Sequence, residues 1–304
     1  MRLGAVCPPG TPFGVPPPFI PLSPPSFTPS RTLTLSRAFL LYLPTLPVTP
    51  SPNHRVSPPP PQTRPARSSA PNGTRGGTLL ESPPQSSDEL CTLLLRLAEP
   101  AYRDFAARLL PPNSAKPLLG VRLPLLRRLA QQLARDERAP QILREEGELW
   151  MEQTMLRGML PGYLRQASCD ERLRLIEDFV PSISNWSLCD SCCAGYRFAR
   201  QHRERVWQHL QPYLGSREEF PARYGVVMLL DHFMQEPDWA PRIAEALLRQ
   251  PAEEFYARMG VAWCGCELHL RYPELARPLL LPGGLPEASR RLALRKIRES
   301  RRSR

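Results

Sequence analysis

The sequence predicts an all-α fold, and two features of the chain after residue 87 support this prediction. Apolar residues recur there at three- and four-residue spacing, which places them on one face of a helix. Short stretches rich in Pro, Gly and Asn separate these segments, and no segment alternates polar and apolar residues for long enough to make a strand. We therefore expect residues 88–304 to form one domain of roughly ten to twelve helices joined by short loops.

Residues 1–87 differ in composition from the rest of the chain. Of the 39 prolines, 22 fall before residue 91, and the first 80 residues contain no Asp or Glu. Proline lacks a backbone donor and disfavours helix at the preceding residue, so we expect a disordered extension with polyproline-II character. Its apolar piece at 38–48 is cut by prolines and is too short to span a bilayer, so we expect no membrane partner.

The net charge and the cysteines indicate which partners and which cellular location the protein is compatible with. The net charge is +11, of which the first 80 residues contribute +7 and the remainder +4. The basic side chains are 38 Arg and two Lys, which codon bias explains most simply. Arginine also grips phosphate in a bidentate manner, so a nucleic-acid partner is compatible with this composition. The eight cysteines form no regular framework, which indicates reduced thiols and a cytoplasmic location.

The helical segments follow one another after residue 88 with breakers such as "LPPNSAKP" and "LPGGLPEA" between them. Helices of this length joined by short loops form either a bundle or a solenoid of stacked helix pairs. The clearest segments in chain order are 123–134, 171–180, 205–214, 223–234 and 241–250.

The spacing of three unusual side chains favours the solenoid. Trp186, Arg223 and Trp263 lie 37 and 40 residues apart, close to the repeat of about 40 residues that is typical of HEAT-type helix pairs. Residues one repeat apart line up along one face of a solenoid. We therefore predict a HEAT-like helical-repeat solenoid with these three side chains on one concave surface.

Five segments resemble, in the same order, the bacterial DNA alkylation repair enzymes, the AlkD-like alkylpurine DNA glycosylases. They are "LLGVRLPLLRRLA", "ISNWSLCDSCC", "EFPARYGVVMLL", "EFYARMGVAW" and "ALRKIRESRR", within about residues 90–302. The resemblance implies a right-handed stack of HEAT-like helix pairs that binds duplex DNA. It implies excision of N3- and N7-alkylated purines in base excision repair, by hydrolysis of the glycosidic bond without metal or cofactor. It also implies a monomer that lies in the cytoplasm, on the nucleoid when bound to DNA.

The resemblance also implies four catalytic residues. Its key aspartate stands four residues after a tryptophan, which corresponds to Asp190 and Trp186. Its arginine on a later helix corresponds to Arg223, where a phosphate contact is expected, and its second tryptophan to Trp263. A carboxylate beside the sugar would stabilise the oxocarbenium that develops as the base leaves, and would orient the attacking water. The tryptophans would make cation–π contacts worth about 0.5–2 kcal/mol each.

Each of these residues also has a structural interpretation. "SLCD" fits a capping pattern with Ser187 as N-cap and Asp190 at the third helical position. Trp186 and Trp263 could be core residues, as we expect of Trp150, Trp207 and Trp239. Arg223 interrupts an apolar helix face and could form an ion pair with an acid on a neighbouring helix.

Further basic residues are candidates for contact with the DNA backbone. Arg122 in "LGVRLP" precedes a helix and could join backbone N–H groups around a phosphate, although a solvated loop arginine is the alternative. Gly120 would permit the turn before it. Arg127, Lys296 and Arg298 are further candidates.

The cysteines of "CDSCC" and "CGC" raise the possibility of a zinc site. A structural zinc site usually pairs two C-x-x-C knuckles, and "CGC" on a helix would point its thiols in different directions. We therefore predict buried, metal-free cysteines. The first alternative to a glycosylase is a catalytically silent HEAT-like scaffold that binds DNA or protein, and a zinc-dependent cysteine site is the second.

Overall fold

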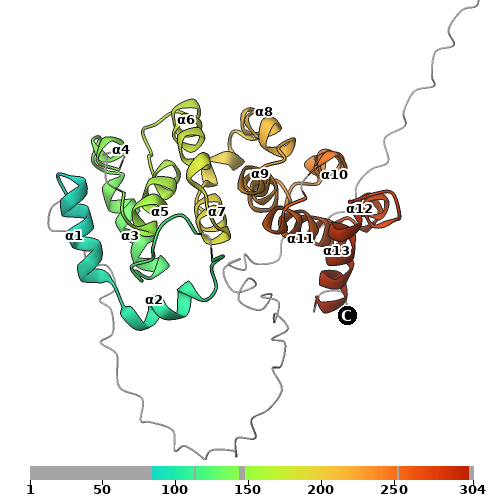
Figure 1. Cartoon of the computed structure of the whole chain (residues 1–304). Helices are drawn as coiled ribbons and strands as arrows, with labels where there is room; N and C mark the ends of the chain where they lie inside the picture. Colours follow the sequence, from blue (N-terminus) through green and yellow to red (C-terminus); the bar gives the residue numbers. More distant parts are fainter. Residues whose placement is uncertain (1–83, 113, 144–147, 252, 301–304) are drawn as a thin grey trace, which may run out of the picture. The chain divides into compact units, whose positions relative to one another are not determined.

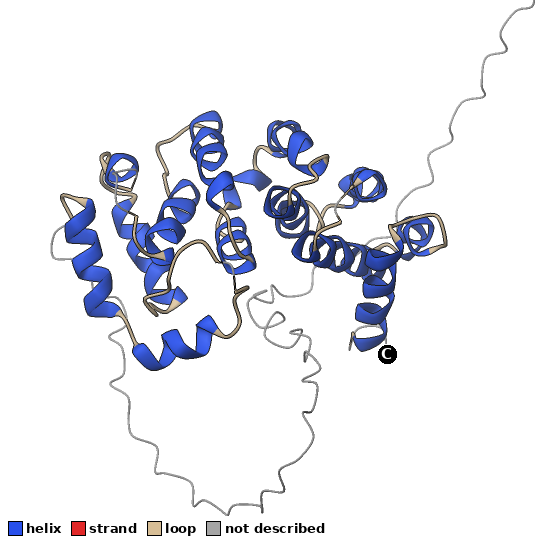
Figure 2. Ribbon diagram, viewed as in Figure 1, coloured by secondary structure: helices blue, strands red, loops and turns tan. Residues whose placement is uncertain are grey.

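The computed structural model describes residues 84–112, 114–143, 148–251 and 253–300 (Figure 1). Within these ranges the chain forms thirteen α-helices and four short 3-10 helices, and no strand (Figure 2). The all-α prediction is confirmed. The helices outnumber the ten to twelve expected because several are short, such as α4 with four residues. The predicted disordered extension lies outside the described residues, except for residues 84–87.

The five segments with the clearest periodicity all fold as helices, namely α3, α6, α8, α9 and α10. The first helix begins at Ser87, one residue before the predicted domain start, and the side chain of Ser86 caps it by accepting from the Glu89 N–H at 3.2 Å. The α-helices are α1 (Ser87–Leu97), α2 (Pro100–Ala107), α3 (Leu123–Leu133), α4 (Ala139–Ile142), α5 (Met151–Met159), α6 (Cys169–Phe179), α7 (Trp186–Cys193), α8 (Arg203–Leu214), α9 (Glu219–His232), α10 (Ala240–Arg249), α11 (Phe255–Arg271), α12 (Pro273–Leu280) and α13 (Glu287–Glu299). The 3-10 helices are η2 (Leu160–Gly162), η3 (Val180–Ser182), η4 (Arg197–Arg200) and η5 (Pro237–Trp239).

The helices from α3 onward form two layers (Figure 1). In the first layer, α3, α5, α7, α9, α11 and α13 pack side by side in chain order. In the second layer lie α6, α8, α10 and α12, each of which packs against a helix of the first layer. This alternation is that of a helical repeat, in which each unit buries its apolar face against the next. It brings Trp186, Arg223 and Trp263 onto three neighbouring helices, α7, α9 and α11.

Helix α9 is enclosed within the stack, because α7 and α11 flank it and α8 covers it. Every residue from Ala222 to His232 is buried. Most of that run is apolar, as burial requires, but Arg223, Asp231 and His232 are not. Three ionisable side chains in a buried run need partners or shifted pKa values, which makes this helix the first place to look for a site.

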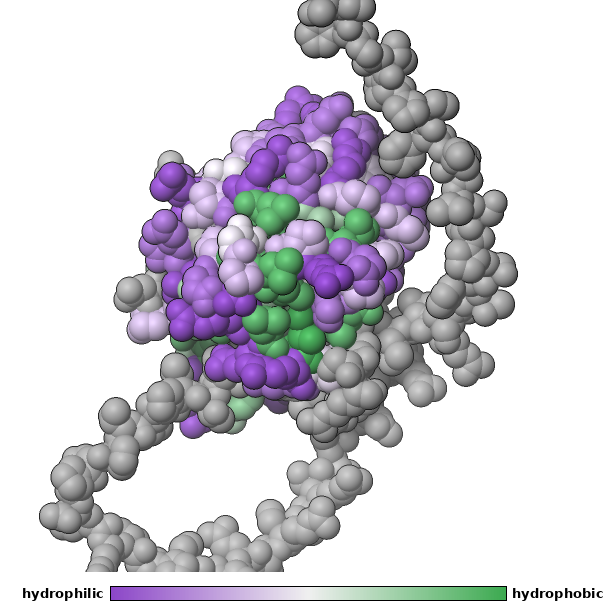
Figure 3. Space-filling view, turned by 90° about the vertical axis from the view of Figure 1, so that its right-hand side faces the viewer, coloured by the Kyte–Doolittle hydropathy of each residue, from purple (hydrophilic) through white to green (hydrophobic). Residues whose placement is uncertain are grey.

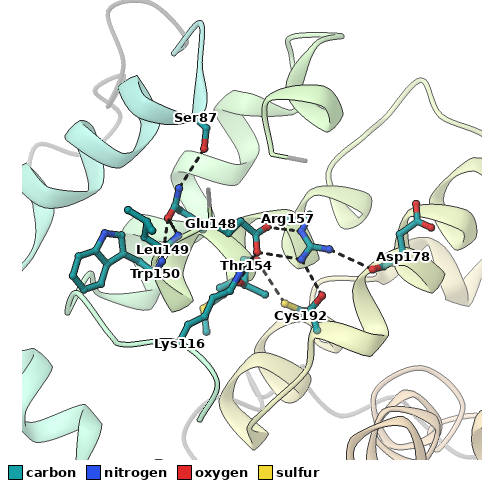
Figure 4. Close-up of polar contacts among 12 residues, drawn as sticks. Ser87, Lys116, Glu148, Leu149, Trp150, Thr154, Arg157, Asp178 and Cys192 are labelled. Carbon is teal, nitrogen blue, oxygen red and sulfur yellow. Dashed lines mark hydrogen bonds and ion pairs between the residues drawn. The ribbon is translucent and has the colours of Figure 1, made fainter. Parts of the chain in front are cut away.

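A polar network fixes the start of α5 to the end of α6 (Figure 4). Glu148 accepts hydrogen bonds from Lys116, from Thr154 Oγ1 at 2.9 Å and from Arg157 Nε at 2.6 Å. Arg157 also donates to the Asp178 carbonyl at 3.3 Å. Burial alone would raise the pKa of Glu148, but the hydrogen bonds from Arg157 and Lys116 hold it below its ordinary value. The network therefore keeps the loop before α5 in place.

The α12–α13 end of the stack presents apolar residues among polar ones (Figure 3). Leu248 on α10, Leu275 on α12 and Leu281 just after it are the exposed leucines of this part of the chain, at 43%, 37% and 52%. Among the described residues, no helix combines the length and apolar character that a membrane span requires.

The contact between α5 and α7 yields a stability prediction. A methyl group on Gly158 would lie 2.4 Å from Phe179 Cζ and 2.7 Å from Cys192 Sγ, so Gly158→Ala forces the packed helices apart. We expect this variant to lose about 1–3 kcal/mol of the free energy of unfolding, measured by urea denaturation. Gly215→Ala is the matched control, because a methyl there meets only ordinary contacts at 3.7 Å or more. Equal stability of the two variants would contradict the packing described here.

Candidate active site

The start of α7 determines where Asp190 points. The N-cap is Asn185, whose side-chain oxygen accepts from the Leu188 N–H at 3.0 Å. Asp190 is thus the fifth helical residue, and the predicted cap with Ser187 as N-cap and Asp190 at the third position is wrong. The backbone geometry that decides between Asn185 and Ser187 is not visible in the residue pattern. Asp190 is consequently free to engage the next helix of the layer.

Asp190 forms a bidentate ion pair with Arg223 of α9. Arg223 Nε donates to Asp190 Oδ1 at 2.9 Å, and Nη2 donates to Oδ2 at 2.8 Å. Arg223 Nη1 donates to the Tyr256 carbonyl of α11 at 2.8 Å. The guanidinium therefore joins three neighbouring helices of the first layer, α7, α9 and α11.

Burial separates the two interpretations of Arg223. Its side chain is only 2% exposed, whereas that of Asp190 is 15% exposed. Burial alone would lower the pKa of Arg223, but the adjacent Asp190 carboxylate raises it above its ordinary value. Arg223 is thus the ion-paired arginine that the sequence left as the alternative. The phosphate contact expected of Arg223 stays a prediction that this conformation does not favour, because Asp190 and the Tyr256 carbonyl occupy a guanidinium that is nearly fully buried.

Gly260 marks the side of α11 that faces Arg223. A methyl group at Gly260 would lie 3.7 Å from Arg223 Cγ and 3.8 Å from Nη1, which is ordinary van der Waals contact. Trp263 follows Gly260 by three residues, so it lies one turn along the same side of α11. Trp263 is half-buried and packs against the core. Its place on α11 therefore puts it on the side of that helix that faces Arg223, and its functional role stays a prediction.

Trp186 stands one turn before Asp190 on α7 and is also half-buried. Its indole Nε1 donates to the Leu109 carbonyl at 3.0 Å, in the segment that follows α2. This bond fixes the ring on the side where that segment reaches α7 (Figure 1). Trp186 and Asp190 are thus presented together, as their spacing predicted.

Lys296 of α13 extends the site at its C-terminal side. It is half-buried, and burial lowers its pKa. The nearby positive charge of Arg223 lowers it further, whereas Cys266 and Glu299 oppose the shift. The electrostatic interaction with Arg223 places Lys296 near the ion pair. Arg298, two residues later, is exposed on the same helix.

The structure pairs Arg122 with an acidic side chain of the protein, in place of the predicted phosphate. It donates to Glu99 through Nε at 2.8 Å and Nη2 at 2.8 Å, and its guanidinium lies 4.8 Å from the centre of the Tyr102 ring. The backbone N–H groups beside it, from residues 119–121, already donate to the buried Glu152 carboxylate at 2.8–3.1 Å. The predicted grouping of Arg122 with these N–H groups around a phosphate is therefore wrong, because a carboxylate of the protein occupies that position. Gly120 does make the expected turn, with φ of +98°.

Arg127 lies in the second turn of α3 and is half-buried. Its positive charge acts on Tyr163 of η2 and on Cys192 of α7. Within the described part of the chain it has no hydrogen-bonded acid, so contact with the DNA backbone stays a prediction for Arg127, as it does for Lys296 and Arg298.

The predicted burial of the cysteines is confirmed for Cys189, Cys192, Cys193, Cys264 and Cys266. Burial raises the pKa of the Cys192 and Cys193 thiols well above its ordinary value, which disfavours the thiolate that zinc would need. Among the described residues, no three His, Cys, Asp or Glu side chains come together as a metal site would require. Trp207 is buried and packs with Trp239 and Phe233, as expected of structural aromatic residues.

Two acidic residues that the sequence interpretation passed over are buried near these elements. Glu152 binds the loop before α3, as described above. Asp231 of α9 is 9% exposed and lies in the apolar run "LLDHF". A carboxylate in an apolar helical run was the available signal for Asp231, since such a residue is rarely buried without a role.

The ion pair predicts strong coupling between two substitutions. Asp190→Ala leaves a buried guanidinium without its acid, so we expect a loss of about 3–5 kcal/mol in the free energy of unfolding. Arg223→Met leaves only the Asp190 carboxylate unpaired, which is more exposed, so the loss in the free energy of unfolding should be smaller. The double variant should cost clearly less than the sum of the two, measured by urea denaturation of all four proteins. Additive costs would contradict the pairing.

The comparisons with known proteins agree with this geometry. A family model described as DNA alkylation repair enzyme matches residues 91–297, which is more than half of the chain. The matched range includes Trp186, Asp190, Arg223, Trp263 and Lys296. Comparison with curated proteins and with solved structures gave no match. A DNA repair family implies DNA as the substrate, and the chain belongs to the DNA alkylation repair enzyme family.

Proposed function

We propose that this protein is a DNA glycosylase that excises cationic N3- and N7-alkylated purines from duplex DNA. The observation that carries the proposal is the Asp190 carboxylate, which is 15% exposed and held by a bidentate ion pair with the buried Arg223. A carboxylate in that setting suits a positively charged reaction centre. The proposed fold is a HEAT-like solenoid, supported by the two-layer alternation of helices and the spacing of 37 and 40 residues between equivalent positions.

The proposed reaction is hydrolysis of the bond between the sugar C1′ and the alkylated base. That base already carries a positive charge, so it leaves with the bonding electron pair and needs no added proton. The sugar left behind becomes an oxocarbenium cation. Asp190 stabilises this cation electrostatically and accepts a proton from the water that attacks C1′.

The ion pair with Arg223 fixes the orientation of the Asp190 carboxylate for this reaction. Each oxygen of Asp190 accepts one hydrogen bond from Arg223, which leaves a lone pair on each oxygen for a water or the sugar. The planar guanidinium fixes the plane of the carboxylate. The faces of Trp186 and Trp263 would contribute cation–π stabilisation of about 0.5–2 kcal/mol each.

We further propose that DNA backbone contacts come from Arg127, Lys296 and Arg298 rather than from Arg223. Lys296 and Arg298 lie on α13, the helix that packs beside α11 in the first layer. That the protein acts as a monomer in the cytoplasm, without metal or cofactor, remains part of this proposal.

The decisive experiment is incubation of methylated duplex DNA with the purified protein, followed by detection of released bases. Asp190→Asn should reduce base release at least about 100-fold, because removing one stabilising group of this type typically costs that much, while DNA affinity changes only a few-fold. The Asn side chain keeps an acceptor for Arg223, and the folded fraction is checked by circular dichroism. A folded Asp190→Asn protein with full activity would rule out the proposed role. Binding of DNA without release by the wild type would instead indicate a silent scaffold.

The mechanism also predicts discrimination by lesion charge. Because Asp190 acts as a carboxylate held by Arg223, it is no source of a proton for a neutral leaving base. Release should be readily detected for 7-methylguanine and 3-methyladenine, and be negligible for hypoxanthine, uracil and 8-oxoguanine. Duplexes that carry one lesion each, compared at equal enzyme concentration, test this. Comparable release of hypoxanthine and 7-methylguanine would contradict the mechanism.

A further inference from the structure

The loop that contains α2, residues 99–122, contacts Trp186 at its tip, and we call it the α2 loop (Figure 1). Its two ends meet, because the Glu99 N–H donates to the Gly120 carbonyl at 3.1 Å. Its tip follows α2, where the Leu109 carbonyl accepts from the Trp186 indole Nε1–H at 3.0 Å. The α2 loop therefore reaches from the region before α3 to the first residue of α7.

The position of the tip depends on a few anchors. No residue of α2 is buried, so the packing of that helix does not fix where the tip lies. Leu110, directly after Leu109, is partly buried and packs against the hydrophobic core. Farther along the loop, the Pro117 carbonyl accepts from the Met151 N–H at 2.9 Å. The α2 loop is thus anchored along its return toward α3, and of these two anchors Leu110 is the one beside the tip.

The bond to Leu109 decides which part of the indole ring stays available. The two faces of an indole ring carry negative electrostatic potential, whereas its edge, and the N–H group above all, is positive. Trp186 stands one turn before Asp190 on α7, so an N–H group turned toward that carboxylate would compete with a cation for it. The Leu109 carbonyl engages the N–H group instead, which leaves the ring faces for a cation.

The structural alternative is that the Leu109 carbonyl only satisfies the indole N–H, which needs an acceptor in a half-buried setting. That role would make the bond matter for stability alone. The location of the bond argues for more, because it fixes the ring of the residue one turn before Asp190. The two roles predict different effects on the rate of base release.

We propose that the α2 loop is a positioning element for base excision, in which the Leu109 carbonyl holds the Trp186 ring with a face toward the lesion at Asp190. This inference rests on the proposed glycosylase function. Leu109 acts through Trp186 and requires no contact with DNA. Loosening the tip of the loop should therefore lower the rate of base release more than it lowers DNA affinity.

The test is a double-mutant cycle in the full-length protein, with single-turnover release of 7-methylguanine as the readout. Leu110→Ala loosens the anchor beside the tip, and Trp186→Phe keeps an aromatic ring but removes the N–H donor. Each single variant should lower the rate about tenfold while DNA affinity changes only a few-fold, because a misplaced group costs rate. In the double variant Leu110→Ala should add no further loss, since the bond that it weakens is already absent.

Two controls separate the bond from general loosening of the fold. Leu118 is also a partly buried leucine of the α2 loop that packs against the core, but it lies near the closed end of the loop. Leu118→Ala should leave the rate of base release close to that of the wild type. Leu110→Met keeps the side-chain volume beside the tip and should retain the wild-type rate.

The indole N–H resonance of Trp186 gives a readout that needs neither DNA nor activity. Identified as the signal lost in Trp186→Phe, it should exchange slowly with solvent in the wild type and faster in Leu110→Ala. An unchanged rate of base release in Trp186→Phe, or additive losses in the double variant, would overturn this inference and leave the glycosylase proposal intact. Absence of base release by the wild type would overturn the proposed function, and the catalytic role of the α2 loop with it.

Discussion

The packing of α7, α9 and α11 centres on one buried guanidinium whose charge must be balanced. Arg223 lies in a run of α9 in which every residue is buried, with 2% of its side chain exposed, and an unpaired charge there would be strongly destabilising. Asp190 and the Tyr256 carbonyl balance it from the helices on either side. The Asn185 cap fixes where α7 begins, and so where Asp190 lies on that helix.

The same ion pair governs what the site can do. It orients the Asp190 carboxylate and leaves a lone pair on each oxygen, but it also neutralises the charge that a cationic substrate would seek. In the proposed mechanism, the electrostatic attraction must therefore come from groups around the pair, and the ring faces of Trp186 and Trp263 are the candidates. Such a site would respond to the charge of a lesion, with little recognition of a particular base edge.

Two further acidic residues, Glu152 and Glu148, accept hydrogen bonds from donor groups that could otherwise bind an external anion. The backbone N–H groups of residues 119–121 converge as they would on a phosphate, yet the Glu152 carboxylate lies among them. Glu148 similarly collects Lys116 and Arg157 into a network that holds the start of α5. Both carboxylates tie loops to the first layer of helices. Basic residues in loops near a helix N-terminus are thus not by themselves evidence of a phosphate site.

The sequence alone determined the helical fold, because apolar residues at helical spacing and short Gly- and Pro-rich breakers are local signals. The spacing of about 40 residues also predicted that Trp186, Arg223 and Trp263 lie on neighbouring helices, and the family resemblance pointed to Asp190 beside them. Only the tertiary structure decided which polar groups pair with one another. Asn185 rather than Ser187 caps α7, Asp190 is the acid of Arg223, and Glu152 fills the loop beside Arg122. Each of these contacts depends on backbone geometry or joins two helices, so a residue pattern does not reveal it. Burial likewise exists only once the helices have packed, and burial is what raises the pKa of Asp231.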